Sequence, residues 1–396
     1  MRIVCATSGA GRAEDAWKTL HQKLVSDSAD SALPDFLAVH GCVGLMTPDL
    51  RQAVCESFDG VALHGGTSSR GVISHDWLRD QSLPCSGAFA IYDPEGNYGT
   101  ASADLGIDPC AVAAQTTRDA LTAAGRPGEA PDMVLLTMAP GFEGPVLEGI
   151  RSVVGADTPV MGGSAADNDL SGDWVQFSAD GYHRTGLVIS ALFPSRPLSF
   201  GYQAGHAPSG PNGIVTAAKD RRIIAIDGKP AAAVYAGWTR GAVTAPAPDA
   251  DPLTIFHQAS HWPLGRVRGQ VRDVPLYALI QPATLHPDGS LDVLMDVKAG
   301  DRLWLMKGCA ENLVARAGRV ARHARAPLKH TQGGLFFYCA GCMMVLADRM
   351  DEVAQHISDA MDGAPFLGLF TFGEQSPSET GLAVHGNLMI SCAVFG

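Results

Sequence analysis

The segment Val160-Met161-Gly162-Gly163-Ser164-Ala165-Ala166-Asp167 has the form of a short apolar strand that runs into a glycine-rich turn. A second segment of this form lies earlier in the chain, where the short apolar stretch Gly60–Leu63 leads into Gly65-Gly66-Thr67-Ser68-Ser69-Arg70-Gly71. Glycine permits tight turns and lets a ligand approach the backbone closely, and successive backbone N–H groups in such turns can bind an anion. The two segments therefore predict buried strands whose ends line a binding site.

A third turn of this kind, Gly41-Cys42-Val43-Gly44, interrupts the apolar stretch Phe36–Leu45, which is predicted to be a buried strand. Three such turns in one half of the chain predict a shared crevice at the strand ends. Their spacing fits neither the dinucleotide fingerprint nor the P-loop, so ordinary tight turns are the alternative for each loop. The candidate ligand-binding residues in these turns are Gly41, Cys42, Gly65, Gly66, Thr67, Ser68, Ser69, Gly162, Gly163, Ser164 and Asp167.

Strand and helix patterns alternate around these turns. A helix is predicted from Asp108 to Ala124, because Asp is a good cap and Pro109 suits the first helical position. The segments Cys85–Tyr92 and Tyr98–Ala103 flank a Pro-Glu-Gly-Asn turn signal, so we expect them to form a hairpin.

The two prolines of Pro194-Ser195-Arg196-Pro197 mark the predicted domain boundary, because they favour an extended backbone. We expect one domain over residues 1–196 and a second over 197–396, in keeping with a chain of 396 residues. Each half ends in strand pairs after helix-bearing units. The expected fold class is therefore α/β to α+β, with two mixed-sheet domains and helices packed on the sheets.

The composition excludes several classes of protein. With 46 % hydrophobic residues, 45 glycines and only 18 % charged residues, the chain is not disordered. Its net charge of −12 argues against a nucleic-acid partner bound through a broad basic surface. It has no apolar stretch of the ~18–20 residues that span a bilayer, and its N-terminus does not resemble a signal peptide. We therefore expect a cytoplasmic protein with no membrane partner.

Cys339-Ala340-Gly341-Cys342 is a Cys-x-x-Cys motif after an apolar strand. No second pair is spaced to complete a structural zinc site, so the thiols are either simply buried or activated. Glu374 also follows an apolar strand, and a carboxylate there needs a partner or a ligand to offset its desolvation. One hypothesis is therefore an enzyme, with Cys339 or Cys342 as the nucleophile, His385 as the base and Glu374 as the orienting group. The sequence leaves open whether there is catalysis.

Two further groups of residues have both a structural and a functional interpretation. His40, His206 and His385 are candidate metal ligands, although a lone histidine is more often a hydrogen-bonded structural residue. The predicted helix Glu311–Arg325 carries Arg316 and four other basic side chains. We expect these to lie on a solvated face, and docking of an acidic partner is the alternative.

In order along the chain, these motifs resemble those of FIST proteins, which have an N-terminal and a C-terminal FIST domain. The resemblance covers nearly the whole chain. It is carried by the loop Gly65–Gly71, the segment Val160–Asp167, Ile226–Ala231, the strand end Phe336–Cys339, and Gly368–Pro377. The sequence departs from the family at Cys342, where FIST proteins often have arginine.

The resemblance implies a sensory, ligand-binding module of bacterial signal transduction, with an amino acid or other metabolite as ligand. Our leading hypothesis places the ligand between the two domains or at the strand ends of the N-terminal domain, where Thr67, Ser68, Ser164 and Glu374 fix its polar groups. The sequence contains no kinase, receptor or nucleotide-cyclase domain, so we expect a stand-alone sensor that acts on a separate partner. The sequence does not indicate an oligomeric state.

One branch of the family binds haem and senses nitric oxide, acting on histidine kinases or cyclic-di-nucleotide enzymes. If this chain belongs to that branch, His206, His40 and His385 are the candidate haem ligands, in that order.

Overall fold

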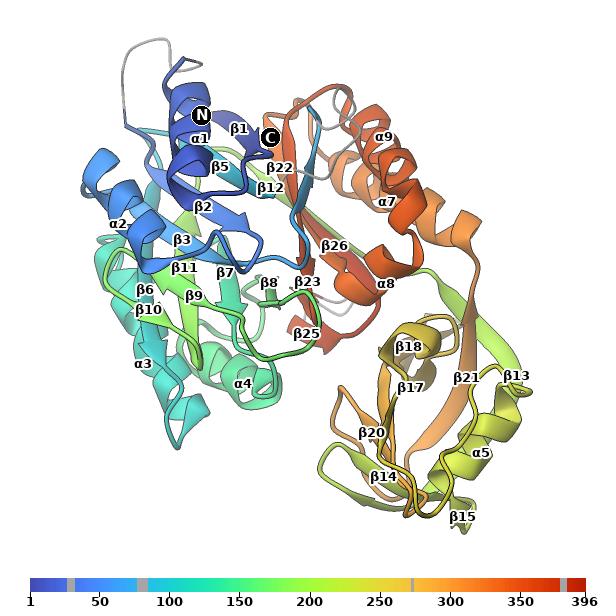
Figure 1. The fold of residues 1–396 in the computed structure, drawn as a ribbon. Helices are drawn as coiled ribbons and strands as arrows, with labels where there is room; N and C mark the ends of the chain where they lie inside the picture. Colours follow the sequence, from blue (N-terminus) through green and yellow to red (C-terminus); the bar gives the residue numbers. More distant parts are fainter. Residues whose placement is uncertain (27–32, 77–84, 272–273, 378–382) are drawn as a thin grey trace.

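The structure is a computed structural model that describes residues 1–26, 33–76, 85–271, 274–377 and 383–396 (Figure 1). Three modules built on one plan make up most of it. In each module a strand, a helix, a second strand, a helix and a third strand follow one another, and a last strand inserts between the first and the second. The second and third strands are parallel to each other, and the last strand is antiparallel to both of its neighbours.

Module 1 has the strand order β1-β5-β2-β3. Its elements are β1 (Arg2–Ser8), α1 (Ala13–Ser26), β2 (Phe36–Gly41), α2 (Pro48–Ser57), β3 (Ala62–Thr67) and β5 (Ser86–Tyr92). The helices cover one face of the sheet, because Trp17, Leu20 and Leu50 pack there against Val39 and Ala88.

Module 2 has the strand order β6-β11-β7-β8. Its elements are β6 (Asn97–Asp104), α3 (Pro109–Ala123), β7 (Met133–Met138), α4 (Glu143–Val154), β8 (Val160–Ser164) and β11 (Gly186–Phe193). The predicted helix start is confirmed, since the Asp108 carboxylate caps α3 by accepting the N–H of Ala111 at 3.0 Å.

Module 3 has the strand order β12-β26-β22-β23. Its elements are β12 (Leu198–Ala204), α7 (Ala310–Arg325), β22 (Gly333–Cys339), α8 (Ala340–Val345), α9 (Met350–Met361), β23 (Phe366–Thr371) and β26 (Met389–Phe395). A further core joins all three modules between their sheets, where Phe36 and Phe89 of module 1 pack in one cluster with Leu135 of module 2 and with Leu335 and Phe395 of module 3.

Each module also gives one strand to the sheet of another, so that the three form a closed ring. Strand β4 (Val72–Ser74) of module 1 pairs with β23, β9 (Gln176–Ser178) of module 2 pairs with β3, and β24 (Glu374–Pro377) of module 3 pairs with β8. The short strands β10 (Tyr182–His183) and β25 (Ala383–Gly386) extend β9 and β24. The predicted domain boundary after residue 196 falls between β11 and β12, and it stays a prediction. Two strands pair with strands on the other side of this boundary, β4 with β23 and β24 with β8.

A β-rich domain, residues 206–308, is inserted into module 3 between β12 and α7, and it lies below that module in Figure 1. Its first and last residues, His206 and Gly308, are paired on neighbouring strands. The elements are β13 (His206–Lys219), β14 (Arg222–Ile226), β15 (Lys229–Pro230), α5 (Ala231–Trp238), β16 (Leu253–Thr254), α6 (Phe256–Ala259), β17 (Leu264–Val271), β18 (Val274–Ile280), β19 (Pro282–Leu285), β20 (Leu291–Val293) and β21 (Arg302–Gly308).

The mixed α/β fold class is confirmed, but the predicted hairpin of Cys85–Tyr92 with Tyr98–Ala103 is wrong. Strand β5 pairs with β1 and β2, whereas β6 pairs with β11 in another sheet. The turn between them passes the chain from module 1 to module 2, and the Asp93 carboxylate fixes it by accepting the Tyr98 O–H and the Ser195 N–H, each at 2.8 Å. No helix within the described ranges is both long and apolar enough to cross a membrane.

Candidate ligand cavity and buried cysteine cluster

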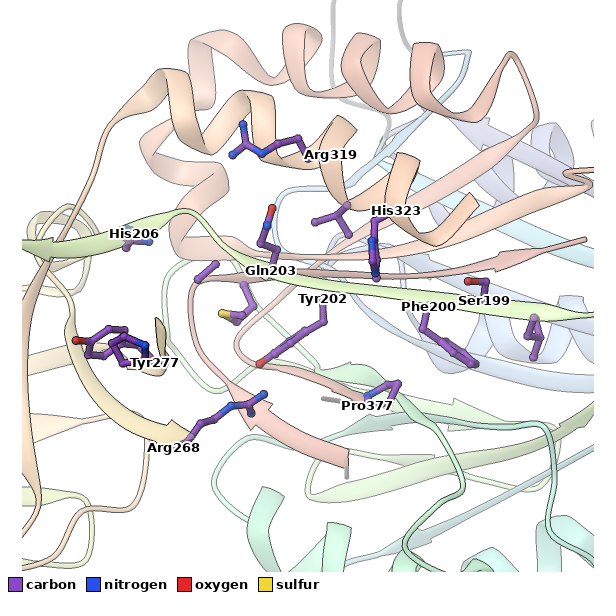
Figure 2. A pocket seen from close by; sticks show the side chains of 16 residues that line it. Ser199, Phe200, Tyr202, Gln203, His206, Arg268, Tyr277, Arg319, His323 and Pro377 are labelled. Atoms are coloured by element: carbon purple, nitrogen blue, oxygen red, sulfur yellow. The ribbon is translucent and has the colours of Figure 1, made fainter. Parts of the chain in front are cut away.

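A cavity of about 770 Å³ lies between module 3 and the inserted domain (Figure 2). Strand β12 forms its floor with Phe200 and Tyr202, and helix α7 contributes Arg319 and His323. The inserted domain supplies the other side. The remaining lining residues are Leu198, Ser199, Gly201, Gln203, Ala204, His206, Arg268, Pro275, Tyr277, Val320, Pro377 and Met389.

The lining of this cavity is basic and aromatic. Arg268 extends from β17 with its guanidinium carbon 5.8 Å from the centre of the Tyr202 ring, and Arg319 projects from α7 (Figure 2). Among the described residues that line the cavity there is no aspartate or glutamate, and neither arginine forms an ion pair within the described ranges. Two guanidinium groups from two different domains are therefore available to an anion.

His206 stands where β12 ends and β13 begins, beside the cavity. Its Nε2–H donates to the Ser260 carbonyl at 3.0 Å, and its buried Nδ1 has no hydrogen-bond partner. Burial, together with the charge of Arg316, lowers the pKa of His206 to about 3. The ring is therefore neutral at physiological pH, with its free lone pair on Nδ1.

The glycine-rich turns lie together at the ends of β2, β3, β8 and β23. Several of the backbone groups that were expected to bind a ligand are instead hydrogen-bonded from one turn to another. The N–H of Ser68 donates to the Gly41 carbonyl at 2.8 Å, and that of Ser164 donates to the Gly373 carbonyl at 2.8 Å. The Ser68 hydroxyl bonds to the Gly71 carbonyl, and Thr67 accepts the Val175 N–H. None of these turns lines the described cavity, so their role in ligand binding stays a prediction.

Close packing accounts for two of the glycines in these turns. A Cβ on Gly65 would lie 2.2 Å from the Phe177 ring, and one on Gly163 would lie 2.3 Å from the Thr371 side chain. Both positions bring strands from two modules together, β3 with β9 and β8 with the end of β23. Two further glycines are also closely packed: a Cβ on Gly66 would meet Thr137 of module 2, and one on Gly162 would meet the Leu136 carbonyl on the neighbouring strand of its own module.

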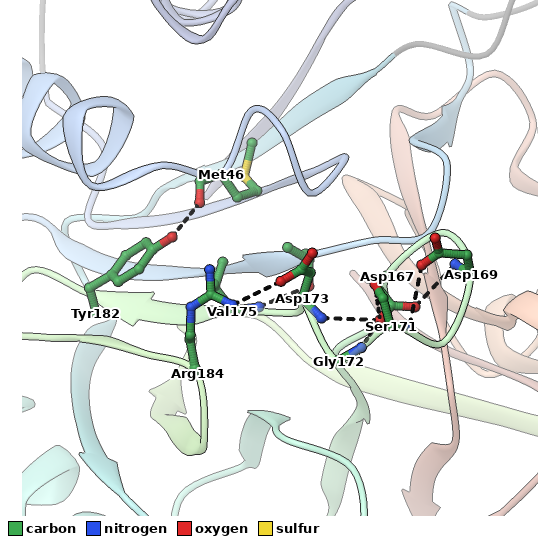
Figure 3. Close-up of polar contacts among 10 residues, drawn as sticks. Met46, Asp167, Asp169, Ser171, Gly172, Asp173, Val175, Tyr182 and Arg184 are labelled. Carbon is green, nitrogen blue, oxygen red and sulfur yellow. Dashed lines mark hydrogen bonds and ion pairs between the residues drawn. The ribbon is translucent and has the colours of Figure 1, made fainter.

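The carboxylate of Asp167 organises its own loop (Figure 3). It accepts the N–H groups of Leu170 and Gly172 at 2.6 Å each, and those of Asp169 and Asp173 at 3.2 Å each. Next to this loop Arg184 pairs with Asp173, and Tyr182 donates to the Met46 carbonyl. Asp167 is therefore satisfied without a ligand.

His40 and Cys42 lie at the end of β2, away from the cavity. The His40 ring is buried and stacks on His64 with ring centres 5.9 Å apart, and Thr137 lies between them as a hydrogen-bond partner. Burial lowers the pKa of His40 to about 3. Cys42 lies beside Cys85, and burial and that neighbour raise its pKa to about 12.

Glu374 and the two cysteines of the Cys-x-x-Cys motif lie in one buried cluster. The Glu374 carboxyl accepts the Thr371 hydroxyl at 2.8 Å and the Met389 N–H at 3.0 Å. Burial, together with Cys339, raises its pKa well above the usual range for a glutamate. Burial therefore favours the protonated form of Glu374, and its hydrogen bonds come from groups of module 3.

Arg316 completes this cluster, which corrects the prediction that it lies on a solvated face. It is fully buried, with its guanidinium carbon 5.2 Å from the centre of the Tyr338 ring. One N–H donates to the Leu388 carbonyl at 2.8 Å, whereas Nε and Nη2 have no hydrogen-bond partner. A signal for this burial was present in the sequence, because Arg316 follows Leu313 by three residues and precedes Val320 by four.

His385 does not join the thiols. Its Nδ1 lies 3.3 Å from the Gln375 amide nitrogen, and its charged neighbours are Glu143 and Arg221. In the part of the chain that the structure describes, no hydrogen bond links His385 to Cys339 or Cys342, so the nucleophile, base and orienting group of the enzyme hypothesis are not seen together there. Within the described residues, no group of three or more histidine, cysteine, aspartate or glutamate side chains is placed to hold a metal ion.

A second contact between the ring and the inserted domain is an ion pair that sequence analysis did not single out. The Arg221 guanidinium, at the start of β14, lies 2.7 Å from the buried Glu143 carboxylate of α4 and 2.9 Å from Asp296. Glu143 also accepts the Ser164 hydroxyl at 2.9 Å and the Gly141 N–H at 3.0 Å.

The mixed sheets, the inserted domain and the basic cavity define a mixed α/β protein with a preformed cavity between two of its parts. Comparison with family profiles matches the FIST N domain to residues 38–229 and the FIST C domain to residues 231–377. The chain belongs to the FIST family, whose domains are small-ligand sensors of signal transduction.

Among solved structures, the chain is similar to the crystal structure of cyanuric acid hydrolase from A. caulinodans. The two are 10 % identical in sequence, the match covers 99 % of this chain and 98 % of that one, and the TM-score is 0.42. No match was found among curated proteins.

Proposed function

We propose that this FIST protein senses a small organic anion, such as the carboxylate of an amino acid or another metabolite, and that the cavity on β12 binds it. The observation that supports this is the pair Arg268 and Arg319, which approach the cavity from the inserted domain and from α7 without a carboxylate partner. Guanidinium groups bind carboxylates with charge-assisted, often bidentate hydrogen bonds. The volume of about 770 Å³ lies in the usual range of ligand sites.

The same arrangement suggests how binding becomes a signal. Because the two arginines belong to different domains, an anion that contacts both favours one placement of the inserted domain over others. The change would be passed to a separate partner protein, for which a histidine kinase or a cyclic-di-nucleotide enzyme is the candidate.

Calorimetry against a panel of amino acids, other carboxylates, and matched neutral and cationic compounds tests the proposal. We expect an anionic binder, with affinity reduced about tenfold or more in Arg268→Ala and in Arg319→Ala. Arg322→Ala is the matched control, since Arg322 is exposed on the same helix but does not line the cavity. Binding of neutral compounds alone, or equal affinities in all three variants, would contradict the proposal.

A second candidate ligand is haem, and one observation favours it. Of the three candidate histidines, His206, His40 and His385, only His206 lines the cavity. Its Nε2–H donates to a backbone carbonyl and its Nδ1 is left over for a metal, which is the usual arrangement of a metal-ligating histidine. His206 would hold the iron through Nδ1, and Arg268 and Arg319 would pair with the propionates. Bound haem would supply an iron that takes up a diatomic gas.

The haem proposal is tested by the absorption spectrum of the purified protein with added haem. We expect a Soret band that is lost in His206→Ala and retained in His40→Ala and His385→Ala. A folded protein that takes up no haem, or a band unaffected by His206→Ala, would rule this candidate out.

A further inference from the structure

We propose that Cys339 and Cys342 form a redox-active dithiol, oxidised by hydrogen peroxide to an intramolecular disulfide, with Arg316 as the charge that makes Cys342 the attacking thiolate. This site is separate from the ligand cavity, and the proposal does not depend on the proposed function.

The first support is the unbalanced charge of Arg316. A fully buried guanidinium is costly unless an anion accompanies it. No carboxylate forms an ion pair with Arg316 in the described part of the chain, and Glu374 is satisfied by Thr371 and Met389. Among the described residues, Nε and Nη2 of the guanidinium have no well-aligned hydrogen-bond partner, and Tyr338 and Cys342 are the side chains that lie beside them. The Glu374 carboxyl lies near enough to act on Arg316 through its charge, but no ion pair joins them among the described residues, so the neighbouring Cys342 thiol is a further candidate for the anion.

The second support is the placement of the two thiols. Cys339 ends β22 and caps α8, and Cys342 lies in the first turn of α8, so the three-residue spacing places the two thiols side by side with a hydrogen bond between them. Burial opposes ionisation of Cys342, but its hydrogen bond with Cys339 and the charge of Arg316 lower its pKa. The pKa of Cys339 is raised by burial and by Cys342. One thiol of the pair is therefore the nucleophile, and the other keeps its proton.

The chemistry is a two-electron oxidation of the pair. The Cys342 thiolate attacks one oxygen of hydrogen peroxide, the O–O bond breaks, and hydroxide leaves as Cys342 becomes a sulfenic acid. The Cys339 sulfur then attacks the Cys342 sulfur, the S–O bond breaks, and the Cys339 proton and the sulfenic hydroxyl leave as water. Overall the two cysteines lose two electrons, and one peroxide becomes two waters once the hydroxide is protonated.

Burial selects the oxidant. Cys342 has no exposed surface and Cys339 has 4 % of its surface exposed, so only an oxidant close to water in size reaches the pair from the Cys339 side. A second pair of neighbouring cysteines, Cys42 and Cys85, serves as an internal comparison. This pair is more exposed than Cys339 and Cys342, but its surroundings raise the pKa of Cys42. If exposure alone governs oxidation, that second pair reacts first.

The experiment treats the reduced full-length protein with hydrogen peroxide, quenches it at intervals, and maps the cysteines by peptide mass spectrometry without reduction. We expect the peptide that contains Cys339 and Cys342 to become about 2 Da lighter before any other change. Thiol titration of the denatured protein should fall from nine thiols by two. In Cys339→Ser, dimedone added together with denaturant at the quench should trap a sulfenic acid on Cys342, and in Cys342→Ser the oxidation of Cys339 should be slow.

Arg316→Met tests the charge, and Arg322→Met on the exposed face of α7 is its control. We expect Arg316→Met to slow disulfide formation on the order of tenfold or more, and Arg322→Met to leave the rate unchanged. If Arg316→Met does not fold, the dimedone result in the cysteine variants decides. Earlier oxidation of Cys42 and Cys85, the absence of a Cys342 sulfenic acid in Cys339→Ser, or an unchanged rate in folded Arg316→Met would overturn the proposal.

Discussion

Glu143 is a carboxylate kept charged inside the protein, so its contribution to stability depends on pH. Burial opposes its ionisation, but His385 and Arg221 lower its pKa to about 2, from an ordinary value of 4.5. Because the pKa is lower in the folded chain, the stabilisation is present above pH 5 and is lost as the pH falls from about 5 to about 2. The difference amounts to about 3 kcal/mol. We expect Glu143→Gln to lose about this much at pH 7 and almost nothing near pH 2.

Denaturant unfolding of the wild type and of Glu143→Gln across this pH range provides the measurement. Glu148→Gln is the control, since Glu148 is exposed on the same helix, and its stability curve should follow the wild type. Parallel curves for the wild type and Glu143→Gln at every pH would show that the charge of Glu143 does not stabilise the fold.

Glu374 gives the opposite pH dependence. Its pKa is raised in the folded chain, so the stability that it provides is complete below about pH 4.5 and declines as the pH rises towards the folded pKa. Glutamine imitates the protonated carboxyl: its Oε1 can accept the Met389 N–H, and its Nε2–H can donate to the Thr371 hydroxyl, which reverses the direction of that hydrogen bond. We therefore expect Glu374→Gln to equal the wild type near pH 4.5 and to become more stable than it as the pH rises to 8. Thermal unfolding at several pH values measures this.

The alanine variant separates the charge from the hydrogen bonds. Glu374→Ala leaves the buried Met389 N–H without its partner and should cost about 1–3 kcal/mol at every pH. If Glu374→Gln instead falls below the wild type as the pH rises, the carboxyl is ionised in the folded protein, and the protonated assignment is wrong.

Sequence reasoning succeeded at single residues where the cause is local. Asp108 and Pro109 specify the start of α3 by their own side chains, and the structure has both in these roles. It failed at Arg316, because five basic residues on one helix suggested a solvated face, and burial depends on β26 and Tyr338, which are distant in sequence. The cluster with Cys342 therefore could not be predicted, although each of its members had been noted.

At the scale of elements, the contact between α3 and α4 depends on one glycine. A Cβ on Gly149 of α4 would lie 2.2 Å from the Cys110 carbonyl and 3.0 Å from Ala113, both on α3. The helices approach too closely for a methyl group, so Gly149→Ala should force them apart and cost about 1–3 kcal/mol in unfolding experiments. Gly144→Ala on the same helix meets only an Asp296 oxygen at 3.7 Å, and it should be neutral or slightly stabilising.

Equal stability of the two alanine variants would mean that α4 can shift on α3 at no cost. Elements of this kind were largely predictable, since α3 has a start signal in Asp108 and Pro109 and α7 has an apolar stripe in its own sequence. Pairing was not predictable to the same extent. Strands β5 and β6 have a turn between them and still belong to different sheets, because Asp93 and Ser195 fix a crossing that only the assembled modules provide.

The whole molecule is a ring of three modules that share strands, with one domain inserted. The repeat is visible in the order of elements and in strand pairing but not in an obvious sequence repeat, because each module carries different side chains on the same plan. The three exchanged strands β4, β9 and β24 are short, and their partners lie far away in the chain. For these reasons the sequence predicted two mixed-sheet halves, and it did not predict a closed ring.

The inserted domain should be removable, because its ends lie together. His206 and Gly308 are paired on neighbouring antiparallel strands, so their Cα atoms are about 4.5–5.5 Å apart and a two-glycine linker can join Gly205 to Cys309. We expect this shortened chain to remain folded, as judged by circular dichroism and a cooperative thermal transition. It should melt at a lower temperature, because Phe256, Leu279 and Met306 of the insert contribute to the core of module 3 and Arg221 pairs with Glu143.

The shortened chain also separates the two proposed sites. It lacks Arg268 and Tyr277 and should bind no anion in the cavity, whereas it keeps Arg316, Cys339 and Cys342 and should still form their disulfide with peroxide. A chain that unfolds on excision would show that the insert is part of the ring's core. A folded chain that still binds the anion with wild-type affinity would place the ligand outside the cavity between the two domains.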